Sequence, residues 1–105
     1  MRQIKGVWAD LLQSATIGQT IGNWSAEKGD LSRWFTIEGV EENRIVVAGA
    51  GLTKPRSVYQ ADFEKVARLW PEYKQRRVPR QEVRNESRNS TYIISLLHWL
   101  EERSA

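Results

Sequence analysis

The chain has 105 residues, 40% hydrophobic and 28% charged, with a formal net charge of +3 at pH 7. These proportions are typical of a globular protein, and we expect one domain over residues 1–105. The absence of cysteine excludes disulfides, thiolate metal sites and a cysteine nucleophile. No apolar run approaches the roughly 20 residues that span a bilayer, and residues 1–5 do not open a secretory signal. We therefore expect a cytoplasmic protein with no membrane partner.

The first predicted element is a helix over residues 2–14. Its apolar residues, among them Val7, Trp8, Leu11 and Leu12, recur three and four positions apart and form one stripe. A short strand near residues 19–25 follows.

The clearest strand signal covers residues 34–40, which are rich in aromatic and β-branched side chains. A turn is predicted before it at 27–30 and another after it at 41–43. Residues 44–48 then return as the second strand of a hairpin, and residues 57–59 predict a short edge strand.

The C-terminal part of the sequence predicts three helices. The first covers residues 60–69 and ends before Pro71, because a proline biases the preceding residue away from helical angles. A short helix follows from Pro79 to Glu86. The last begins at residue 89 or 90, reaches 102, and carries apolar residues on more than one face. The order α-β-β-β-α-α-α predicts an α+β fold, with an antiparallel sheet of three to four strands packed against the N- and C-terminal helices.

Positive charge is concentrated in one segment. Between residues 74 and 88 there are six basic and two acidic side chains, whereas the rest of the chain is close to neutral. The segment is either a solvated connection between helices or a surface for phosphate groups, for which arginine is well suited. The candidate nucleic-acid-binding residues are Lys74, Arg76, Arg77, Arg80, Arg84, Arg88, Asn89 and Ser90.

The two predicted helices on either side of residues 87–89 have the outline of a helix-turn-helix. The second helix is apolar over a wide arc, which favours phosphate binding at its start over a helix lying in the groove. The five tryptophans add a second option. Trp24 and Trp34, which flank a predicted loop, either pack inside or stack on a base or a partner's side chain.

No arrangement of residues predicts catalysis. His98 has only Glu102 at helical spacing, and Asp62 and Glu64 are two positions apart on a predicted helix, so they point to different sides. We therefore expect a non-enzymatic domain with no metal and no cofactor.

From Phe35 onward the pattern resembles a C-terminal module of uncharacterised restriction-associated and other DNA-processing bacterial proteins. The resemblance is carried by the hairpin, by Asp62-Phe63-Glu64-Lys65-Val66, by residues 80–84 and by residues 89–97. It implies a role accessory to DNA processing, and the size fits the stand-alone product of a mobile bacterial gene cassette. Two functions are therefore carried forward: a nucleic-acid-binding module that contacts the phosphate backbone of DNA or RNA, and a homo-oligomeric protein-interaction domain.

Overall fold

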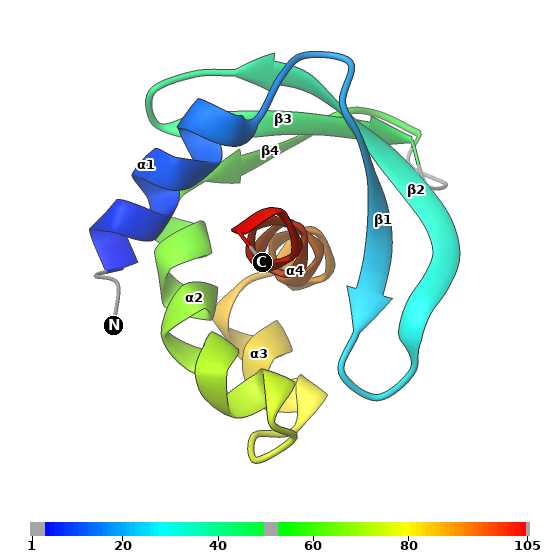
Figure 1. Cartoon of the computed structure of the whole chain (residues 1–105), viewed down its shortest axis with the longest axis vertical. Helices are drawn as coiled ribbons and strands as arrows, with labels where there is room; N and C mark the ends of the chain where they lie inside the picture. The colour runs from blue at the N-terminus through cyan, green and yellow to red at the C-terminus, as the bar shows by residue number, and fades with distance from the viewer. Residues whose placement is uncertain (1–3, 50–52, 105) are drawn as a thin grey trace.

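The computed structural model describes residues 4–49 and 53–104, which form four helices and one four-stranded sheet (Figure 1). The elements in chain order are α1 (Ile4–Ser14), β1 (Thr20–Ser25), β2 (Gly29–Val40), β3 (Arg44–Gly49), β4 (Arg56–Tyr59), α2 (Gln60–Lys74), α3 (Arg80–Glu86) and α4 (Ser90–Ser104). The strands pair antiparallel in the order β1-β2-β3-β4. The predicted α+β class is confirmed, and the sheet has four strands. In the part of the chain that the structure describes, no helix is both long and apolar enough to cross a bilayer.

Helix α4 runs through the middle of the molecule. The sheet curves around one side of it, and α1 and α2 cover the other (Figure 1). A helix enclosed in this way needs apolar residues on several faces, and Ile93, Ile94, Leu96 and Leu97 are all buried. The wide apolar arc predicted for this helix is thus buried within the chain itself.

One face of the sheet packs onto this central helix. Its buried side chains alternate along the strands with more exposed ones, as a sheet covered on one face requires, and they are Ile21, Phe35, Ile37, Ile45, Val47 and Val58. The β1–β2 register shifts between Gly22 and Trp24. The N–H of Trp24 donates to Ser95 Oγ at 3.0 Å, and Ser95 Oγ donates to the Thr91 carbonyl at 2.9 Å. The buried Ser95 of α4 thus provides a hydrogen-bond acceptor for the backbone N–H at the irregular position in the sheet.

The β1–β2 hairpin is longer than the sequence predicts. Strand β2 begins at Gly29, five residues before Trp34, because Ser25 pairs with Gly29 and Trp24 with Asp30. The tight turn is stabilised by the Lys28 N–H, which donates to Ser25 Oγ at 3.1 Å, and Gly29 supplies the required positive φ of 74°. The polar residues at the start of β2 are mostly exposed, so they give no alternating apolar signal.

The predicted turn between β2 and β3 is confirmed at residues 41–43. Glu41 Oε2 and Arg44 Nη2 lie 2.8 Å apart across it. The hydrogen bond from Arg44 lowers the pKa of the Glu41 carboxyl, and the same bond raises the pKa of Arg44. Because the pair is solvent-exposed, it fixes the turn rather than adding much to stability.

The predicted end of the first C-terminal helix is wrong. Helix α2 continues through Pro71 to Lys74, although proline removes one hydrogen bond from a helix interior. Pro71 lies on the exposed face, while Trp70 and Tyr73 on either side of it are buried. Burial of these two rings outweighs the local cost of proline, and the extra turn brings Tyr73 to the site described next.

Candidate nucleic-acid interface

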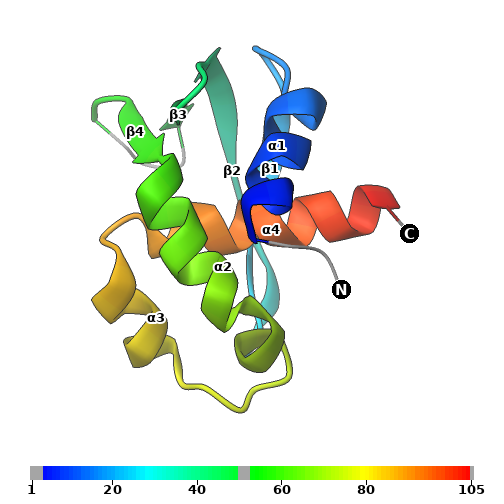
Figure 2. The same cartoon turned by 90° about the vertical axis from the view of Figure 1, so that its left-hand side faces the viewer.

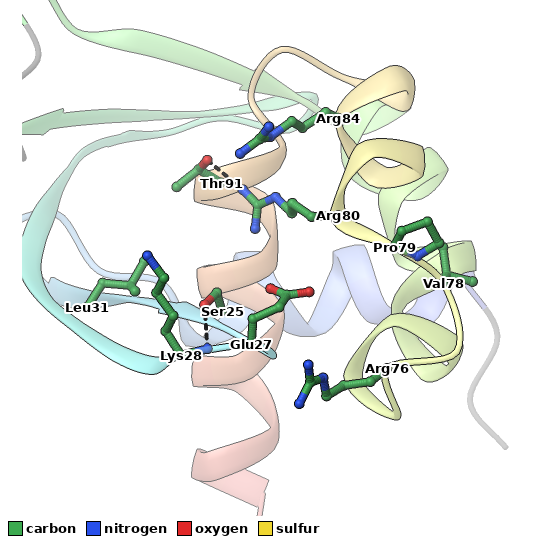
Figure 3. Close-up of a pocket in the computed structure, with 10 residues that line it drawn as sticks. All are labelled: Ser25, Glu27, Lys28, Leu31, Arg76, Val78, Pro79, Arg80, Arg84 and Thr91. Carbon is green, nitrogen blue, oxygen red and sulfur yellow. Dashed lines mark hydrogen bonds between the residues drawn. The ribbon is translucent and has the colours of Figure 1, made fainter.

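A pocket of about 610 Å³ opens between the β1–β2 turn, the α2–α3 connection and α3, with Thr91 of α4 at its base (Figure 3). Four cationic side chains line it, and Glu27 is the one acid among the described residues of its wall. The cations are Lys28, Arg76, Arg80 and Arg84. Figure 3 shows the guanidinium groups of Arg76 and Arg80 directed into the hollow that also holds the Glu27 carboxylate.

Arg80 is held in place by contacts with three groups. Its Nη2 donates to Thr91 Oγ1 at 2.7 Å, and its Nη1 lies 3.4 Å from the Tyr73 hydroxyl. The guanidinium carbon sits 5.9 Å from the centre of the Tyr73 ring. Arg80 Nε is buried and has no acceptor among the described residues. Arg80 is therefore oriented before any ligand arrives, and part of its donor capacity is unused.

Tyr73 connects the walls of this pocket. Its ring is fully buried, its hydroxyl donates to Glu27 Oε1 at 2.8 Å, and it accepts from the Ala26 N–H at 3.1 Å. The hydroxyl thereby ties the β1–β2 turn to the end of α2. It also holds the Glu27 carboxylate beside the arginines without neutralising its charge.

Arg76 enters the pocket through an unusual backbone conformation. Helix α2 ends in a Schellman motif, in which the Arg76 N–H donates to the Tyr73 carbonyl and the Arg77 N–H to the Glu72 carbonyl, both at 2.9 Å. Arg76 occupies the left-handed position of this motif, with φ 62°, where glycine is usual. A side chain is therefore kept at a strained position, and that side chain lines the pocket.

Replacing Arg76 with glycine is expected to increase the free energy of unfolding by about 0.5–1 kcal/mol, because relief of left-handed strain exceeds the entropy that glycine adds to the unfolded chain. Urea denaturation followed by circular dichroism measures the change. The matched control is Arg77→Gly at the next position, where φ is not positive, and this variant is expected to lose stability. If Arg76→Gly loses as much stability as Arg77→Gly, the backbone at Arg76 is not strained.

A second pocket of about 380 Å³ lies on the β4 side of the start of α4. Three cations line it, with no acid among the described lining residues: Lys54, Arg56 and Arg88. Arg56 Nη1 donates to Asn89 Oδ1 at 3.3 Å. The two pockets meet the same end of α4, since Asn89 lines the second and Thr91 the first.

The structure divides the predicted basic segment. Arg76, Arg80 and Arg84 line the first pocket and Arg88 the second. The other two cations lie outside both pockets in ion pairs: Lys74 Nζ is 2.7 Å from Glu101 Oε1, and Arg77 Nη1 is 3.5 Å from Glu72 Oε2.

Asn89 and Ser90 are both buried; Asn89 lines the second pocket, and Ser90 lines neither. The Asn89 amide donates to the Ser57 carbonyl at 3.0 Å and accepts from Arg56, which ties the start of α4 to β4. The enclosed position of α4 also leaves no exposed recognition helix to enter a DNA groove, although α3 and α4 follow each other as the helix-turn-helix outline predicts (Figure 2).

The two candidate stacking residues differ in their environment. Trp24 stacks on His98 with ring centres 4.2 Å apart and packs edge-on against Trp70 at 5.6 Å, so one face of its ring is already covered. Trp34 is 58% exposed and lies on the uncovered face of the sheet, opposite Gly22. It lines neither pocket.

Three cations of these pockets lie outside the basic segment, so they are not among the binding residues predicted from the sequence. Lys28 sits in a hairpin turn, Lys54 precedes Pro55 in the connection after β3, and Arg56 begins β4. The pair around Pro55 is a local hint of positive charge, but only the folded chain brings it to the start of α4. Among the described residues, no three histidine, aspartate or glutamate side chains come together to hold a metal ion.

Comparison with known proteins adds no relative: no family model, curated protein or solved structure matches this chain.

Proposed function

We propose that this chain is a non-enzymatic nucleic-acid-binding domain that contacts the phosphate backbone of DNA or RNA. The contact is made by the α4 basic surface, defined as Lys28, Lys54, Arg56, Arg76, Arg80, Arg84 and Arg88. The observation that carries the proposal is the gathering of seven cations from three separate segments into two pockets that both reach the start of α4, with Glu27 as the single acid among the described residues of the two linings.

Charge of this kind predicts binding that tolerates any base sequence, since phosphate contacts carry no sequence information. Five of the seven cations are arginine, whose planar guanidinium can make two hydrogen bonds to one phosphate. The two acids of α3, Glu82 and Glu86, line neither pocket and so do not oppose the surface directly. A dissociation constant of about 10⁻⁴ to 10⁻⁶ M at physiological salt is expected from such contacts alone.

The double substitution Arg80→Glu/Arg84→Glu is expected to abolish this binding, because it reverses two charges that share one face of α3. Fluorescence anisotropy with labelled duplex and single-stranded DNA, and with RNA of the same sequence, at about 50 mM salt measures the loss. Arg84→Glu alone, at an exposed position, is expected to weaken binding while the melting temperature stays within a few degrees of the unsubstituted protein.

The matched control is Lys65→Glu/Arg68→Glu, which changes the net charge equally on the exposed face of α2, outside both pockets. Binding by the control close to that of the unsubstituted protein supports a localised surface. If the protein does not bind at low salt, or if both double variants bind equally, the basic segment is a solvated connection and the proposal is wrong.

The proposal extends to the setting of the protein. A role accessory to DNA processing, as the product of a mobile bacterial gene cassette, is what the resemblance given above implies, and it is proposed together with the binding and with a cytoplasmic location.

Self-association is the second candidate, and one observation favours it: Trp34 is 58% exposed on the uncovered face of the sheet. A wide apolar arc on α4 would also favour self-association, but that arc is buried inside one chain. Size-exclusion chromatography with and without DNA separates the two candidates. A dimer without DNA that Trp34→Ser converts to monomer favours self-association.

A further inference from the structure

We propose that the first pocket, lined by Lys28, Arg76, Arg80 and Arg84, is a site for a phosphate monoester, either the terminal phosphate of a nucleic-acid strand or that of a free nucleotide. For the strand end, the inference rests on the nucleic-acid binding proposed above. For the free nucleotide it stands alone.

The shape of the pocket favours an end over the middle of a strand. Its volume of about 610 Å³ lies in the range of small-molecule sites, and it is walled by the β1–β2 turn on one side and by α3 on the other (Figure 3). A duplex, whose major groove alone is about 12 Å wide, can contact the open side of such a space but cannot enter it. A terminal phosphate has one ester link instead of two, so it can enter with the rest of the strand outside.

The charge of the lining favours a dianion. Four cations face one carboxylate, Glu27. A phosphate monoester carries a charge of about −1.5 to −2 at pH 7, whereas each internal phosphodiester carries one negative charge. The terminal group therefore gains more from the same cations, and it offers three oxygens to donors that converge from the α2–α3 connection and α3.

Arg80 is the fixed donor of this site. Thr91 Oγ1 and the Tyr73 hydroxyl hold its guanidinium at 2.7 and 3.4 Å, so little side-chain freedom is lost when an anion binds. Arg84 is exposed and Arg76 comes from the end of α2, and both can close around a phosphate that Arg80 has oriented. The Glu27 carboxylate repels a bound anion, so removing its charge should have the opposite effect to removing the charge of an arginine.

The test uses one single-stranded oligonucleotide prepared with a 5′-phosphate, a 3′-phosphate or hydroxyl ends, together with adenosine monophosphate and adenosine as competitors. We expect a terminal phosphate to tighten binding by about tenfold, and the nucleotide but not the nucleoside to compete. Isothermal titration calorimetry with the nucleotide alone shows whether the site takes a free nucleotide or only the end of a strand. A preference for phosphorylated strands without binding of the nucleotide assigns the site to strand ends.

Variants assign the preference to this pocket. Arg80→Gln is expected to remove the advantage of the phosphorylated end, and Arg84→Gln, at an exposed position, repeats the test without disturbing a buried contact. Glu27→Gln keeps an acceptor for the Tyr73 hydroxyl and is expected to increase the advantage. Arg88→Gln in the second pocket is expected to weaken all oligonucleotides by the same factor.

The two proposals fail differently. Equal binding of phosphorylated and hydroxyl-ended strands, with no competition by the nucleotide, overturns the monoester site and leaves backbone binding intact. Binding of the nucleotide without any oligonucleotide overturns the nucleic-acid function and supports the site. An advantage of the phosphorylated end that survives both Arg80→Gln and Arg84→Gln overturns the assignment to this pocket.

Discussion

Raising the salt concentration from about 50 to 200 mM is expected to weaken binding to duplex DNA by about 10³- to 10⁴-fold. Each neutralised phosphate releases condensed counterions, which gives a slope of about −0.9 per contact in a plot of log affinity against log salt. Seven cations line the two pockets, so full engagement predicts a slope of about −6 for duplex and about −5 for single strands. Anisotropy titrations at four salt concentrations measure it.

The slope of log affinity against log salt also reports the loss of a single phosphate contact. Arg84→Gln is expected to reduce its magnitude by about 1, because one phosphate contact is lost. The control Arg68→Gln removes an equal charge from the exposed face of α2 and is expected to leave the slope unchanged. Binding that is indifferent to salt would exclude phosphate contacts as its source.

The elements with a strong apolar period were predictable from sequence. The stripe of Trp8 and Leu11 predicts α1, although residues 2 and 3 of the predicted helix lie outside the described part of the chain. The β-branched run from Arg44 predicts β3, and the broad apolar arc around Leu97 predicts an enclosed α4. In each of these, local pattern and tertiary burial favour the same structure.

The errors arise where burial overrides a local signal. Pro71 is a strong local stop, yet Trp70 and Tyr73 both find places in the core only if the helix continues. The start of β2 gives the opposite case, since its exposed polar residues lack a strand pattern and pair because β1 lies beside them. Neither outcome can be read from a window of a few residues.

The candidate site shows the same limit. Six cations are close in sequence between residues 74 and 88, but the turn after α2 separates neighbours: Arg76, at φ 62°, lines the pocket, whereas Arg77 pairs with Glu72 outside it. Lys28 joins the same pocket from the first hairpin. The sequence therefore predicts that a basic region exists, while its membership depends on backbone angles and on contacts between distant segments.

Leu97→Ala is expected to lower the free energy of unfolding by roughly 2–5 kcal/mol. Leu97 is 3% exposed on the central helix, so its truncation removes buried apolar surface and leaves a cavity among side chains on several sides. Small domains have total stabilities of about 5–15 kcal/mol, so this one change removes a large part of the total. Urea denaturation monitored by circular dichroism gives the difference by linear extrapolation.

The matched control for this substitution is Leu69→Ala on α2. The chemical change and the helix propensity are the same, but Leu69 is only partly buried at the edge of the core, so the expected loss is smaller. The difference between the two variants therefore isolates what the central position of α4 contributes. A loss below about 1 kcal/mol for Leu97→Ala, or equal losses for both variants, would show that the core is not organised around α4. A large difference would also explain why this helix is apolar on so many faces, since α1, α2, α3 and β1 all pack against it.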